Sequence, residues 1–186
     1  ERAMGIPADH IKTLTDGEAT LAKIRVVFES WLPRVVRSAG SRVVVYYSGH
    51  GARDKNDEAY LVPWDGYPDS LEQSGYPLRQ VYAALDKLKV RETILILDAC
   101  YSGQGSRALK SSDDRPVVQV RDTAKDPFAA AGRVRVLASS TGTQESGPAT
   151  EARHGLFTYH LLRALDGEAD RDGDKKITLD ELFGFV

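Results

Sequence analysis

The 186-residue chain contains a single cysteine, Cys100. One cysteine cannot form an intrachain disulfide, and it cannot supply a metal site that needs several thiolates. It is therefore either a small buried side chain or a reactive thiol. Scarce cysteine is typical of a reducing compartment, and we expect a cytoplasmic protein.

The chain also lacks an excess of either charge and any long apolar run. It has 25 Lys and Arg against 27 Asp and Glu, a net charge of −2. This balance gives no electrostatic reason to expect nucleic acid or an anionic membrane surface as a partner. No apolar run approaches the roughly 20 residues that span a bilayer. The length and the 41% hydrophobic content suit one domain, over residues 1–186, with its own core.

Segments with strand patterns alternate with segments of helical spacing. Strands are predicted at 43–47, 59–63 (a short edge strand), 93–99 and 134–140, and helices at 18–36, 78–88 and 155–165. The continuous apolar run at 93–99 is typical of a strand buried on both faces of a parallel sheet. We therefore predict an α/β protein, a three-layer αβα sandwich with a mostly parallel central sheet.

Two of the predicted strands end in residues that can perform catalysis. Val43–Tyr47 leads to His50, and Thr93–Ala99 leads to Cys100. Sites in open α/β sheets lie beyond the carboxyl ends of the strands, so neighbouring strands would bring these side chains together. An imidazole within reach activates a thiol, and the amides of Gly51 and Cys100 are candidate oxyanion donors. Taken singly, each residue is more often a turn histidine or a buried cysteine.

The segments YYSGHG (46–51) and LDACYSG (97–103) resemble the two signature motifs of the caspase-like cysteine peptidases, the group of caspases, metacaspases, paracaspases and their bacterial relatives. Similarity extends through DEAYLVPWD (57–65), VLASSTGTQES (136–146) and GLFTYHLLRAL (155–165). The resemblance implies a catalytic dyad of His50 and Cys100, with oxyanion amides from Gly51 and Cys100. It also implies peptide-bond hydrolysis through a thioester, with no cofactor required.

Asp98 lies two residues before Cys100, where metacaspases place an acid in the pocket for the residue preceding the cut. A carboxylate there favours Arg or Lys. The alternative is that Asp98 only caps the turn. The loop at 105–133 resembles the family's processing linker. Five of its basic residues are candidate self-cleavage sites or simply part of a solvated charged loop: Arg107, Lys110, Arg115, Arg121 and Lys125.

The resemblance also shows a departure, because the family's fold begins with a strand and helix upstream of the region that matches here. We therefore expect a fragment whose first strand, and a second acid of the basic pocket, come from an adjoining segment or domain. An unpaired edge and exposed apolar surface should result. The rival function is an inactive or regulatory caspase-like scaffold in a signalling protein, although such a scaffold has no reason to keep His50, Cys100 and Asp98 together.

The acidic tail DRDGDKKITLDE (170–181) partly matches a calcium-binding EF-hand loop, with candidate ligands Asp170, Asp172, Asp174 and Glu181. Its sixth position, which needs glycine, is Lys175. The favoured alternative is an acidic turn followed by a helix, with Thr178 as N-cap and Glu181 completing a capping box. Some metacaspases are activated by calcium through other acids, and a further cluster lies in roughly the right region: Asp54, Asp57, Asp65 and Asp69.

Overall fold

The computed structural model describes residues 6–99, 134–139 and 156–186. Its centre is a parallel sheet of three strands in the order β1 (Arg42–Ser48), β5 (Glu92–Asp98) and β6 (Val134–Ala138). The predicted strands at 43–47, 93–99 and 134–140 are thereby confirmed. The β5 strand lies in the middle and places Leu95 and Leu97, both 0% exposed, on one face.

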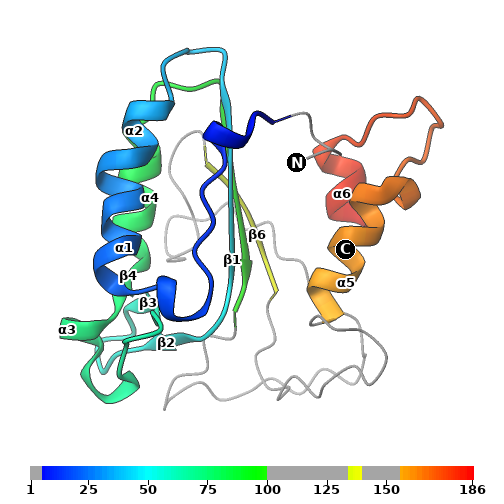
Figure 1. Ribbon diagram of the computed structural model, residues 1–186. Helices are drawn as coiled ribbons and strands as arrows, with labels where there is room; N and C mark the ends of the chain where they lie inside the picture. Colours follow the sequence, from blue (N-terminus) through cyan, green and yellow to red (C-terminus); the bar gives the residue numbers. More distant parts are fainter. Residues whose placement is uncertain (1–5, 100–133, 140–155) are drawn as a thin grey trace.

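One face of the sheet is covered by α1 (Leu21–Val26), the π-helical segment Val27–Trp31, α2 (Leu32–Val35) and α4 (Leu78–Asp86) (Figure 1). In α4 the buried side chains are Leu78, Val81 and Leu85, spaced by three and four residues. This spacing forms one apolar stripe on a helix, and the stripe packs against Leu95 and Leu97 of the sheet.

The opposite face is covered by α5 (Leu156–Arg163), a second π-helical segment (Ala164–Glu168) and α6 (Leu179–Phe185). A separate apolar cluster fills this layer, including Ile96 and Leu137 from the sheet and Phe157, Leu161 and Leu182 from the helices. Helices thus lie on both sides of a parallel sheet, which confirms the predicted three-layer αβα sandwich.

A small antiparallel sheet follows β1 and consists of β2 (Gly51–Arg53), β3 (Ala59–Leu61) and β4 (Tyr76–Pro77). The prediction of an edge strand at 59–63 was wrong, because β3 lies between the other two strands and each of its residues is at most 3% exposed. Its neighbours, of three and two residues, are too short to be recognised as strands from their sequence. The remaining short elements are α3 (Leu71–Ser74) and the 3₁₀ turns Ala8–His10, Asp16–Glu18 and Pro68–Ser70.

Within the described residues, β1 pairs with β5 alone, so its other edge has no partner strand. On the α5 side of this edge Val44 is 41% exposed and Tyr46 is 47% exposed. An unpaired edge and exposed apolar side chains are what the departure from the family's usual fold predicts. None of the helices in the described ranges is both long and apolar enough to cross a membrane.

Candidate active site

The carboxyl ends of β1 and β5 lie side by side at one end of the central sheet. The two strands pair in parallel with Ser48 opposite Asp98, and the Gly49 amide donates to the Asp98 carbonyl at 3.2 Å. His50 follows Gly49 directly, and Cys100 comes two residues after Asp98. The position of Cys100 itself, and the predicted loop at 105–133, lie outside the described residues.

The Tyr47 side chain holds the turn that carries His50. The Tyr47 hydroxyl donates to the carbonyl of His50 at 2.7 Å and lies 3.1 Å from the carbonyl of Val62. The Val62 amide donates back to the His50 carbonyl at 2.9 Å. Burial raises the pKa of Tyr47 to about 12, against the opposing effect of a hydrogen bond with the Val62 backbone, so the hydroxyl remains a donor at neutral pH.

Gly49 lies close against the Tyr47 side chain at this turn. A Cβ at this position would lie 2.9 Å from the Tyr47 hydroxyl oxygen, closer than real Cβ contacts. The His50 side chain is exposed, and Gly51 begins β2, opposite Leu61. The sequence motif therefore presents an imidazole at the sheet edge on a backbone anchored from two sides.

The Asp98 carboxylate is held by hydroxyl groups from two other elements. Ser139, directly after β6, donates to Oδ1 at 3.3 Å, and Thr158 of α5 donates to Oδ2. The Tyr46 hydroxyl lies 2.7 Å from Thr158 Oγ1. Ser139 and Thr158 are 7% and 8% exposed, while Asp98 is half-buried. Asp98 is thus fixed by specific contacts at the same sheet edge as His50.

The sequence interpretation missed Tyr46, Ser139 and Thr158. A signal existed for Thr158, because it stands beside Phe157 on the apolar side of a helix that also buries Leu161. Buried hydroxyls nearly always have a hydrogen-bonding partner, so a threonine at this place calls for one. Which partner it finds depends on contacts 60 residues away, which the local sequence does not contain.

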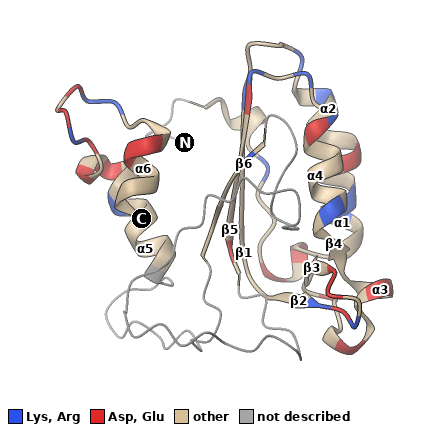
Figure 2. Cartoon of the chain, turned by 180° about the vertical axis from the view of Figure 1, so that it is seen from behind, with Lys and Arg blue, Asp and Glu red and all other residues tan. Residues whose placement is uncertain are grey.

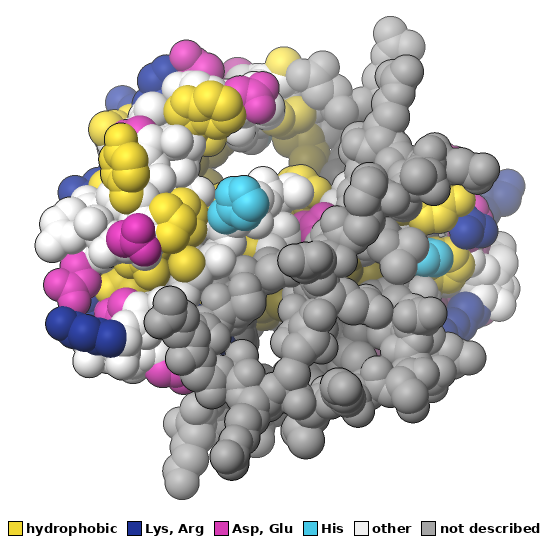
Figure 3. Space-filling model, turned by 90° about the horizontal axis from the view of Figure 1, so that it is seen from below, with side chains coloured by type: hydrophobic (Ala, Val, Ile, Leu, Met, Phe, Trp, Pro, Cys, Tyr) yellow, Lys and Arg dark blue, Asp and Glu magenta, His cyan; other side chains and the backbone are white. Residues whose placement is uncertain are grey.

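Figure 3 shows the molecule from below, the side on which β1 and β5 end. An imidazole side chain lies on this face with hydrophobic and acidic side chains beside it. Figure 2, from behind, shows acidic residues near β3 and α3 and in the loop before α6. Besides Asp98, acidic residues are therefore found near β3 and in the loop before α6. The hydrogen bonds of these carboxylates indicate what each of them does.

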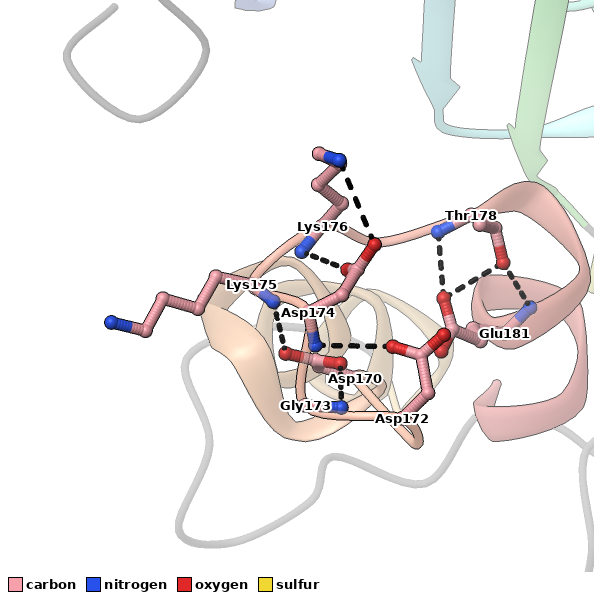
Figure 4. A network of polar contacts seen from close by, with 8 residues as sticks. All are labelled: Asp170, Asp172, Gly173, Asp174, Lys175, Lys176, Thr178 and Glu181. Atoms are coloured by element: carbon pink, nitrogen blue, oxygen red, sulfur yellow. Dashed lines mark hydrogen bonds and ion pairs between the residues drawn. The ribbon is translucent and has the colours of Figure 1, made fainter.

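The acidic loop before α6 brings three of the four calcium candidates together (Figure 4). Oxygens of Asp170, Asp172 and Asp174 lie within 4.8 Å of one another, the one such acidic or metal-ligating group in the described ranges. Lys175, at the sixth position of the loop, has φ 64°, the left-handed conformation that calcium loops assign to glycine. The backbone thus forms the sharp turn without a glycine at the sixth position of the loop.

The fourth candidate, Glu181, is engaged in the cap of α6. Its carboxylate accepts from the Thr178 amide at 2.9 Å, from the Thr178 hydroxyl at 2.7 Å and from the Arg171 amide at 3.0 Å. These hydrogen bonds, those from Thr178 foremost, lower the pKa of Glu181 to about 2. The predicted capping box is confirmed, and Glu181 would have to leave it to join a calcium ion.

Two other acids suggested for calcium have structural contacts. Asp65 accepts from the Leu21 amide at the start of α1 at 2.8 Å. Asp54 accepts from the amides of Asn56 and Glu58 in the turn between β2 and β3. Burial raises the pKa of Asp54, but the hydrogen bonds from Glu58 and Asn56 outweigh it and leave the pKa below its ordinary value. Both carboxylates are explained by the backbone they cap.

The parallel sheet, the helices on both faces and the histidine at the carboxyl end of a strand define a class of α/β domain with its site at the sheet edge. A family model described as "Peptidase_C14: Caspase domain" matches residues 10–186. The chain belongs to the caspase domain family, which is a family of cysteine peptidases. No curated protein sequence matches the chain.

Proposed function

We propose that this protein is a cysteine endopeptidase that hydrolyses peptide bonds after arginine or lysine, with Cys100 as nucleophile and His50 as base. The observation that carries the proposal is the parallel pairing of β1 with β5, in which Ser48 lies opposite Asp98. Residues that follow the two strands therefore leave the sheet at the same edge. His50 follows one strand and Cys100 follows the other.

In the proposed reaction the Cys100 thiol gives its proton to the His50 imidazole, and the sulfur attacks the scissile carbonyl carbon. The amides of Gly51 and Cys100 donate to the oxyanion that forms. His50 then returns the proton to the leaving amine as the C–N bond breaks, which leaves a thioester on Cys100. Water attacks the thioester with His50 as base, the C–S bond breaks, and the carboxylate product and the thiol are released.

Asp98 is the proposed recognition group for the basic side chain of the substrate. A carboxylate in a half-buried position attracts a cationic side chain and disfavours an acidic one. Its two hydrogen-bonded neighbours, Ser139 and Thr158, fix its orientation. Cleavage after aspartate is therefore not expected.

The test compares fluorogenic peptides that end in Arg, Lys or Asp, with matched Cys100→Ala and His50→Ala variants. We expect cleavage after Arg and Lys that falls by several powers of ten in both variants, as when the nucleophile or base of a hydrolase is removed. Cleavage after Asp, or silence on every peptide from a folded protein, would contradict the proposal, and silence would favour the scaffold function.

Calcium dependence is tested in the same assay by adding calcium or a chelator. The acids Asp170, Asp172 and Asp174 lie together, and calcium binding would draw Glu181 out of the cap of α6. A calcium requirement that disappears in an Asp172→Asn variant would assign the effect to this loop. Equal rates with calcium and chelator would show that the peptidase needs no metal.

We also propose that the peptidase cuts its own chain within 105–133, after one of the basic residues there. Active enzyme is incubated with the Cys100→Ala variant as substrate, and mass spectrometry identifies new chain ends. Fragments ending at Arg107, Lys110, Arg115, Arg121 or Lys125 are expected. A Cys100→Ala chain that stays intact beside active enzyme would refute self-processing.

The open edge of β1 supports a further proposal, that an adjoining segment of a longer polypeptide covers it. Val44 and Tyr46 are exposed beside that edge, and Leu162 and Leu165 of the facing helical layer are 48% and 40% exposed. A longer polypeptide that supplies such a segment should have a higher Tm than the 186-residue chain. Equal Tm values would contradict this.

A further inference from the structure

The contacts of Asp98 include a chain of hydroxyl groups whose direction can be assigned. Thr158 has one hydroxyl proton, and it donates this proton to Asp98 Oδ2. The contact between Thr158 Oγ1 and the Tyr46 hydroxyl, at 2.7 Å, must then have Tyr46 as its donor. The hydrogen bonds therefore run from Tyr46 to Thr158 and on to Asp98, and they join β1, α5 and β5.

Ser139 makes the second contact, and it is the weaker one. Its hydroxyl lies 3.3 Å from Asp98 Oδ1 and 3.5 Å from the Leu97 carbonyl, so one proton is shared between two acceptors. Among the described residues Thr158 has no such competing acceptor, and it receives a hydrogen bond from Tyr46 that strengthens it as a donor. The orientation of the carboxylate therefore depends mainly on Thr158.

An ionised carboxylate has about four lone-pair sites, two on each oxygen. One site on Oδ1 is used by Ser139 and one on Oδ2 by Thr158. Counting the contacts of the described residues, one acceptor site thus remains on each oxygen. Two parallel acceptors suit the two-pronged donor edge of a guanidinium group, whereas an ammonium group is a point charge with no such preference.

We propose that Thr158 and Tyr46 are positioning residues that set the Asp98 carboxylate for bidentate binding of arginine, so that the peptidase prefers Arg to Lys before the cut. This inference rests on the proposed peptidase function and adds a substrate preference to it. Neither residue is assigned a contact with the reacting atoms in this proposal. Their effect passes through the orientation of Asp98, and α5 becomes part of the specificity pocket.

The experiment measures kcat and KM for matched peptides ending in Arg and in Lys, with wild type, Thr158→Val, Thr158→Ser and Tyr46→Phe. Valine keeps the shape of threonine and removes the hydroxyl, whereas serine keeps the hydroxyl. For Thr158→Val we expect the KM for the Arg peptide to rise about tenfold, with kcat within about twofold, because a hydrogen bond to a charged group is lost. The KM for the Lys peptide should change much less, so that the Arg preference shrinks.

Thr158→Ser should retain the wild-type ratio of Arg to Lys cleavage, and Tyr46→Phe should lower it about threefold. Thr93→Val is the matched control, because it makes the same change at a buried threonine of β5 near the opposite end of that strand. Tyr67→Phe is the control for Tyr46→Phe, since Tyr67 is 70% exposed on another loop. Circular dichroism establishes that each variant is folded. If Thr158→Val does not fold, Tyr46→Phe and Thr158→Ser still test the proposal.

Outcomes for the two proposals are distinguishable. Wild-type protein that cleaves neither peptide overturns the proposed function, and the inference with it. Wild-type cleavage after Arg combined with an unchanged Arg-to-Lys ratio in Thr158→Val and Tyr46→Phe overturns the inference alone. A uniform fall in kcat for both peptides would also overturn it, because that result indicates general damage.

Discussion

Replacing Tyr47 with phenylalanine tests how firmly the His50 turn is held. The hydroxyl of Tyr47 bridges the carbonyls of His50 and Val62, and the change removes it while the ring stays in the core. The His50 carbonyl keeps its bond from the Val62 amide. The loss should therefore be that of one ordinary hydrogen bond, about 1 kcal/mol, and a fall in Tm of roughly 2–4 °C for a chain of this size.

The same variant predicts a pH effect of defined sign. The pKa of Tyr47 is about 12 in the folded protein, against its ordinary value of 10.0. Because the folded state holds the proton more tightly, this contribution to stability is complete below pH 10 and is lost as pH rises toward 12. By pH 10.5 the wild type should have lost about 1 kcal/mol through this group, a loss that phenylalanine cannot show.

Urea unfolding of wild type and Tyr47→Phe at pH 8 and at pH 10.5, followed by circular dichroism, measures both effects. The wild type should be the more stable protein at pH 8, and the difference should nearly close at pH 10.5. Tyr67→Phe serves as the control and should match the wild type at pH 8. Equal stability at pH 8, or a difference that stays constant between the two pH values, would refute the account of Tyr47.

Three further predictions concern stability. Thr93 is 1% exposed and its hydroxyl has no partner among the described residues, so Thr93→Val should raise the free energy of unfolding by about 1 kcal/mol; a loss in urea unfolding would contradict this. A Cβ on Gly75 would come within 2.8 Å of an aromatic carbon and 2.9 Å of a carbonyl oxygen. Gly75→Ala should therefore lower the free energy of unfolding by about 1–3 kcal/mol. Gly40→Ala is the control, because the nearest atom to its Cβ would be 3.6 Å away. Thr178→Ala should cost about 1 kcal/mol by removing the cap of α6. Because the pKa of Glu181 is lowered to about 2 by the same cap, wild-type stability should also fall as pH drops from about 4.5 toward 2, and an acid titration in which Thr178→Ala shows the same fall would contradict this linkage.

The sequence predicted best the features whose signals are local. The apolar run of β5 and the helical spacing of α4 are visible within ten residues, and the structure has both elements where they were expected. The capping box of Thr178 and Glu181 is equally local, since its two residues are three positions apart. Such features depend on residues that are close together in the chain, and their pattern is visible in the sequence.

Features that depend on distant contacts could not be predicted in the same way. The central place of β3 depends on pairing with Tyr76 and Pro77, which have no strand pattern of their own. The partners of Asp98 lie 41 and 60 residues away, and Tyr46 lies 112 residues from Thr158. Asp98 was therefore recognised as a candidate because it lies two residues before Cys100 in the sequence, whereas the residues that orient it were not recognised.

The adjacent tyrosines of β1 show how one local pattern can serve two distant contacts. Successive side chains of a strand point to opposite faces of the sheet, so Tyr46 and Tyr47 cannot serve the same layer. Tyr47 packs on the side of α1 and α4 and holds the turn of His50, whereas Tyr46 reaches Thr158 of α5 and, through it, Asp98. A shift of β1 by one residue would exchange the two faces and undo both contacts at once. The register of this strand therefore fixes the histidine and the acid together, and Tyr46→Phe and Tyr47→Phe should act on different steps, the first on the choice of substrate and the second on the stability of the turn.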